Sequence, residues 1–176
     1  GAPAVTSHIE GTPDDQTVIT SDVTLDESEI SRPRRMAEFE LLGVAIYEPA
    51  IALRVARDQA SENGSNLFDP ARYHHPTSRT LARFIAQRFA DGETFTVQQL
   101  LTALEDEGDR EVASRLYFDG RNACGERDDQ AMAALHSAIS ALESVTRREQ
   151  LQEMVVIGRA DRADDGTGGC GADALR

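Results

Sequence analysis

The chain has 176 residues and a formal net charge of −13, a size typical of one domain with tails. The acidic balance disfavours direct binding of nucleic acid, because a field of that sign repels phosphate. The densest basic cluster, Arg32, Arg34 and Arg35, is a weak signal against that field. All 18 basic residues are arginine, which excludes a phosphate-loop lysine and a Schiff-base lysine.

The two cysteines, Cys124 and Cys170, indicate a reducing compartment. They lie far apart and have the spacing of neither a disulfide framework nor a zinc site. No apolar run approaches the roughly 20 residues that span a bilayer, and no basic-then-apolar signal segment is present. We therefore expect a cytoplasmic protein that does not associate with membranes.

Residues 1–31 are expected to form an acidic, disordered leader. They contain seven acidic residues and no arginine, so they hold more than half of the net charge. Their scattered valine and isoleucine side chains bury too little apolar surface to offset the entropy of ordering the chain. Because the sequence begins with Gly1 and not with methionine, we also expect a processed chain or a fragment of a longer protein.

The next part of the chain carries three expected helices, recognised by the spacing of their apolar residues. They cover residues 33–47, 49–63 and 77–90. Pro33 suits the first position of a helix, and Pro49 restarts the chain after the first one. Gly64 provides a C-terminal stop, and Phe68, in the loop that follows, is expected to insert into the core.

Three more helices are expected in the second half of the chain. They run from Thr96 to Gly108, from Asp109 to Gly120, and over residues 128–157. Thr96 and Gln99 form a capping box that opens the first of them, and Asp109 is expected to cap the second. The apolar seam of the long last helix changes register after Val145, which lets its C-terminal half leave the core.

Together these segments predict an all-α fold, a helical bundle of about six helices with a long C-terminal helix. Three regions are expected: the leader (1–31), a helical domain (32–157) and a flexible tail rich in glycine and aspartate (158–176). A domain of this size buries a sizeable core. No internal repeat with a fixed period is present.

No set of residues in the sequence has the pattern of a catalytic, metal or cofactor site. His74 and His75 are adjacent and lack a third ligand at useful spacing, so a polar loop is the better interpretation. Cys124 and His136 would make a nucleophile and base only with a third residue to orient the histidine. A packed thiol is the simpler interpretation of Cys124.

The helical segments share several landmarks with a known family. They are Glu40-Leu41-Leu42-Gly43, Tyr47-Glu48-Pro49, Leu67-Phe68, Leu81 with Phe84-Ile85, Phe95-Thr96 with Leu100-Leu101 and Leu104, and Leu135, Ile139, Leu142 and Arg147-Arg148 in the long helix. This pattern resembles the C-terminal helicase-binding domain of bacterial DNA primases over about residues 36–157. The N-terminal domain of the replicative helicase is similar in fold and is an alternative.

The resemblance implies a non-catalytic domain of a primase, which is a nucleotidyltransferase. Such a domain binds the replicative DNA helicase and couples priming to unwinding. Nothing in the chain resembles the zinc-binding or polymerase modules of that family, so we expect no primer synthesis and no cofactor. In this role the late part of the last helix is expected to bind the partner, through Leu142, Val145, Arg148, Leu151, Met154 and Val155.

Two interpretations of this surface compete with partner binding. Leu142 and Val145 also have the spacing of core residues. In addition, a stand-alone structural or oligomerisation protein would use the long helix as a homodimer seam. Apolar anchors beside an arginine suit the docking of one helix on another in either case.

Overall fold

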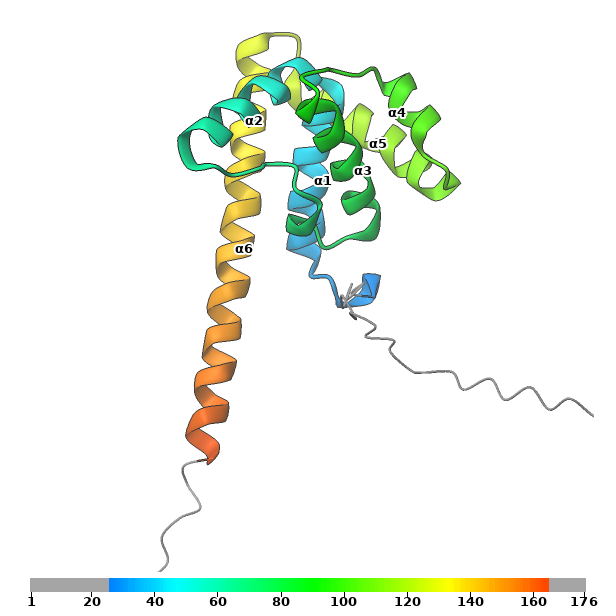
Figure 1. Ribbon diagram of the computed structural model, residues 1–176. Helices are drawn as coiled ribbons and strands as arrows, with labels where there is room; N and C mark the ends of the chain where they lie inside the picture. The colour runs from blue at the N-terminus through cyan, green and yellow to red at the C-terminus, as the bar shows by residue number, and fades with distance from the viewer. Residues whose placement is uncertain (1–25, 165–176) are drawn as a thin grey trace, which may run out of the picture.

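The computed structural model describes residues 26–164, and this part of the chain is helical and contains no strand (Figure 1). The α-helices are α1 (Arg32–Tyr47), α2 (Pro49–Asn63), α3 (Pro76–Ala90), α4 (Val97–Ala103), α5 (Glu107–Cys124) and α6 (Asp128–Asp164). Two 3-10 turns, Glu27–Glu29 and Pro70–Arg72, complete the described elements. The predicted all-α bundle with about six helices and a long last helix is confirmed. Most of the predicted leader and tail lies outside the described residues.

Several helix ends follow signals that the sequence displays. The Ser31 hydroxyl accepts a hydrogen bond from the backbone of Arg34 at the start of α1. The predicted capping box at α4 is confirmed, since Thr96 and Gln99 exchange hydrogen bonds of 3.0 and 3.2 Å. Gly64 ends α2 in the left-handed conformation, with φ of 69°.

The predicted bounds of α5 are wrong at both ends. Asp106 and not Asp109 is the N-cap, and its carboxylate accepts a hydrogen bond of 3.0 Å from the Asp109 backbone. Gly108 lies in the first turn of α5 and does not end a helix there, since even in a helix interior glycine costs only about 1 kcal/mol relative to alanine. The helix also continues through Gly120 to Cys124. Gly120 is therefore not a helix stop, and its role is a packing role.

Gly120 lies where α5 packs closely on α1. A Cβ atom on Gly120 would be 2.0 Å from the carbonyl oxygen of Gly43, and one on Gly43 would be 2.8 Å from the carbonyl oxygen of Leu116. The two backbones approach to this distance because neither glycine carries a side chain. The pair thereby fixes how α1 and α5 lie against each other.

The core forms around α1, which packs against both α5 and α6. Leu41, Leu42 and Ile46 of α1 are almost completely buried. Phe68 is buried too, as predicted, and its ring meets that of Phe89 edge-on at 5.5 Å. The loop between α2 and α3 is thus anchored in the core by an aromatic side chain.

Helix α6 extends well beyond the rest of the bundle (Figure 1). Leu135, Ile139 and Leu142 in its first half are buried in the core. The second half leaves the core, as the change of register predicts. The helix does not end at Ile157 but continues to Asp164. A single Gly158 costs only about 1 kcal/mol in a helix interior, too little to end it. We call residues 147–164 the stalk.

Candidate functional site

Large apolar side chains gather on the stalk, where no other described part of the chain covers them. Their exposed fractions are 58% for Leu151, 68% for Met154, 54% for Val155, 67% for Val156 and 62% for Ile157. Scattered exposed apolar residues are ordinary, but a contiguous group of this kind marks an interaction surface. The stalk is therefore the candidate functional site.

The six residues predicted to bind a partner divide into two groups. Leu142 is buried and Val145 is half-buried against the core, so these two follow the competing interpretation. Arg148, Leu151 and Met154 are exposed on the stalk, as is Val155. The division falls where α6 leaves the body, between the half-buried Val145 and the exposed Arg148.

One face of the stalk carries the exposed residues that the sequence singled out. At about 100° of rotation per residue, positions 151, 154, 155, 158 and 162 fall within an arc of about 100°. Gly158 lies on the exposed side of this face, where a Cβ atom would meet nothing within 4 Å. Val155, Gly158, Arg159, Asp161 and Arg162 line a shallow hollow along it. We call this side the outer face.

Val156 and Ile157 were not predicted as site residues. Val156 points to the other side of the stalk, and Ile157 lies between the two sides, about 60° from Met154. Both line a hollow of 480 Å³ together with Glu29 and His74. The signal was the unbroken apolar run from Met154 to Ile157. The side chains of such a run point to different sides of a helix. Burying all of them therefore requires contacts on more than one side of the helix.

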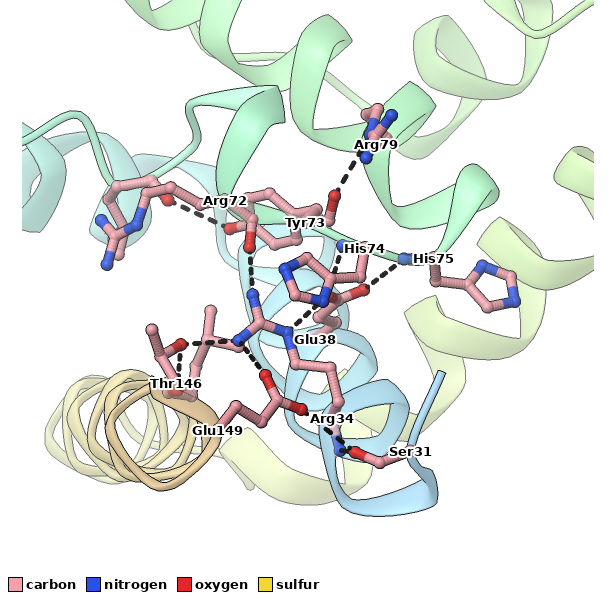
Figure 2. Close-up of polar contacts among 12 residues, drawn as sticks. Ser31, Arg34, Glu38, Arg72, Tyr73, His74, His75, Arg79, Thr146 and Glu149 are labelled. Carbon is pink, nitrogen blue, oxygen red and sulfur yellow. Dashed lines mark hydrogen bonds and ion pairs between the residues drawn. The ribbon is translucent and has the colours of Figure 1, made fainter. Parts of the chain in front are cut away.

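A buried arginine holds the base of the stalk (Figure 2). Arg34 of α1 is 2% exposed and pairs with Glu38 at 2.9 Å. Its guanidinium also donates to the Thr146 hydroxyl at 2.6 Å, to the Glu149 carboxylate at 3.3 Å and to the Arg72 carbonyl. One side chain thus joins α1, the α2–α3 connection and α6.

Glu38 completes this cluster from the other side. It is fully buried, and its carboxylate accepts hydrogen bonds from the backbone of His74 at 2.6 Å and of His75 at 3.1 Å. Figure 2 shows both backbone groups directed at this carboxylate. Each guanidinium nitrogen of Arg34 and each carboxylate oxygen of Glu38 has a hydrogen-bond partner. A buried ion pair is stable only when its atoms are satisfied in this way. The cluster positions the stalk and has no unused reactive group.

In the sequence, Arg34 belongs with Arg32 and Arg35 to a weak basic cluster. The four-residue spacing between Arg34 and Glu38 was a usable signal, because such pairs meet on one helix face. The sequence does not predict that these two side chains are buried, because their burial depends on residues more than 100 positions away in α6. Hence the basic cluster is in part an internal structural element.

The adjacent histidines have separate structural roles. The His75 ring accepts a hydrogen bond from the Thr77 backbone and so caps α3, and its other nitrogen lies 2.9 Å from Glu27. Burial, followed by the nearby Arg34 charge, lowers the pKa of His74. Among residues 26–164 no three or more histidine, cysteine or acidic side chains are arranged to hold a metal ion.

The Cys124 thiol is buried at the end of α5. Burial, with a smaller contribution from Glu48, raises its pKa to about 11. His136 lies on an exposed face of α6, and the described residues include no hydrogen bond between the two. A thiol with a raised pKa is a poor nucleophile at neutral pH.

We predict that Cys124 is nearly inert to alkylation in the folded protein. In a Cys170→Ser background, modification by iodoacetamide at pH 8 is expected to be at least about 100-fold slower than in urea, because the thiolate fraction falls tenfold for each unit of pKa and access is blocked. Mass spectrometry over time measures this rate. Rapid labelling of the native protein would contradict the buried position.

No described helix is both long enough and apolar enough to cross a membrane. Comparison of the chain with protein-family models, curated proteins and solved structures finds no match. The evidence for a function therefore lies in the stalk, in its base held by Arg34, and in the hollow beside it.

Proposed function

We propose that this chain is a non-catalytic helical interaction domain that docks onto a partner protein through the stalk. The observation that carries the proposal is the group of large apolar side chains, each more than half exposed, within two turns of a helix that is rigidly held at its base. The resemblance of the helical landmarks supports the replicative DNA helicase as the partner, in the cytoplasm, with the chain as part of a DNA primase.

The outer face has the composition of a docking helix. Leu151, Met154 and Val155 would supply the apolar anchors, and full burial of such a side chain is worth about 1.5–3 kcal/mol. Arg148 lies at the edge of this face and forms no ion pair within residues 26–164, and it would pair with a carboxylate of the partner. A few anchors with a flanking arginine are typical of interface hot spots.

Replacing Met154 and Val155 together by aspartate is expected to weaken helicase binding by at least about 100-fold, because two charges would be buried in an apolar contact. The fold should be unchanged, since both side chains are exposed. Surface plasmon resonance measures the binding, and circular dichroism measures the melting transition. The matched control is Ala133→Asp with Ser137→Asp, two exposed positions on the first half of the same helix.

Unchanged helicase binding in the Met154 and Val155 variant, with the protein folded, would remove the stalk as the docking surface. The alternative, a structural protein that pairs with itself through the stalk, is favoured by the same exposed residues. Light scattering separates the two: a stable homodimer without helicase that the double aspartate variant converts to a monomer would replace the present proposal.

A further inference from the structure

The two sides of the stalk differ in chemistry as well as in direction. Val156 and Met154 are two residues apart, so they point about 160° away from each other around the helix. Val156 and Ile157 border the hollow that the stalk makes with the 3-10 turn at Glu29 and with His74. A partner that covers only the outer face would leave Val156 in water and Ile157 at the edge of the contact.

Charge is separated between the two sides. The stalk contains the arginines 147, 148, 159 and 162. None of them is among the described residues that line the hollow, whereas Glu29, Glu149 and Glu153 are. Arg34, which contacts the hollow through Glu149, is already paired with Glu38 and Glu149. Glu29 and Glu153 form no ion pair within residues 26–164, so the apolar wall formed by Val156 and Ile157 has a rim with net negative charge.

We infer that this hollow is a second docking site, and that it takes a partner segment with an aliphatic side chain next to a lysine or arginine. This inference rests on the proposed function, since it assigns to the docking partner a second element that packs on the side of the stalk opposite the outer face. Val156 and Ile157 receive the aliphatic group, and Glu29 and Glu153 receive the cation. The partner then holds the stalk from both sides.

The charge of the hollow also argues against the chain's own ends as its occupant. Residues 1–25 contain four acidic residues and no arginine, and residues 165–176 contain two aspartates and one arginine. Segments of that composition would bring like charge to Glu29 and Glu153. A basic segment from another protein is the complementary occupant.

The test reverses the charge of the hollow without touching the outer face. The variant is Glu29→Arg with Glu153→Arg, and both positions are exposed. The matched control is Asp58→Arg with Glu62→Arg, two exposed acidic residues of α2 that give the same change in net charge. Two probes are used: the purified replicative helicase, and a labelled amphipathic helical peptide that carries leucines flanked by arginines. Fluorescence anisotropy measures the affinity of each.

We expect the hollow variant to bind both probes at least about tenfold more weakly than the wild type, and the control to bind them like the wild type. Equal binding by the hollow variant and the control would overturn the inference. So would a chain lacking residues 1–25 that binds the peptide at least about tenfold more tightly, because residues 1–25 would then be the occupant.

The two proposals fail in different ways. If the wild type does not bind the helicase, yet binds the peptide in a manner that the hollow variant loses, the helicase proposal fails and the second docking site stands. If the wild type binds the helicase, and only the Met154 and Val155 variant weakens this binding, the outer face stands and the second site is wrong.

Discussion

Replacing Gly120 with alanine is expected to lower the free energy of unfolding by about 3 kcal/mol, the upper end of the cost of overpacking a core. The added Cβ would be 2.0 Å from the Gly43 carbonyl oxygen and 3.1 Å from the Tyr47 Cβ. Both oxygen and carbon atoms belong to the adjacent helix α1, and a backbone carbonyl cannot rotate away as a side chain can. The clash is relieved only if α1 and α5 separate, which opens the core. Urea denaturation followed by circular dichroism measures the loss.

Gly158→Ala is the matched control for this prediction. Gly158 is also inside a helix, but a Cβ there meets nothing within 4 Å. Alanine should therefore stabilise the stalk by up to about 1 kcal/mol, the difference in helix propensity between the two residues. A loss of less than about 1 kcal/mol for Gly120→Ala would show that the two helices are free to move apart, in conflict with the close approach.

Replacing Arg34 with methionine is expected to cost about 3–5 kcal/mol, because it leaves the Glu38 carboxylate buried without its cation. The Thr146 and Glu149 contacts that hold the base of the stalk are lost at the same time. Chemical denaturation measures the stability. Arg32→Met serves as the control, since Arg32 is exposed and a surface substitution usually changes stability by less than about 0.5 kcal/mol.

A double-mutant cycle isolates the pair itself. Adding Glu38→Gln to Arg34→Met removes the buried charge, so the double variant should be more stable than the sum of the two single losses predicts. Recovery should remain partial, because the Arg72 carbonyl, which the structure joins to Arg34, still lacks its donor. Strict additivity of the two losses would show that Arg34 and Glu38 are not coupled.

Helix α1 links the fold to the proposed function. Neither Arg34 nor the Gly43–Gly120 contact includes an exposed apolar residue of the stalk, yet both determine where the body ends and where the stalk begins. Both act by fixing α1, the helix against which α5 and α6 pack. If the proposed docking holds, a variant that loosens α1 should weaken partner binding by displacing the stalk, whereas Met154 and Val155 variants should weaken it by removing contacts.

Features that depend on a few neighbouring residues could be read from the sequence. The capping box at Thr96, the stop at Gly64 and the helical periodicity are of this kind, because hydrogen bonds and side-chain spacing within one turn decide them. The departure of the last helix from the core was also predictable, from the shift of its apolar seam after Val145. On this basis the fold class was predicted correctly. Arg148, Leu151, Met154 and Val155 are exposed on the stalk, and their binding role stays a prediction.

Only the tertiary structure decided which side chains are covered. Gly120 has the appearance of a helix stop, but the close approach of α1 makes it an interior residue of α5. Leu142 and Leu151 belong to one helix and look alike in sequence, yet one is in the core and the other is in water. Periodicity shows which residues share a face of a helix. Segments distant in the chain decide what packs against that face. The burial of Arg34 and Glu38 therefore appears only once those segments pack together. The same is true of the hollow beside Val156 and Ile157.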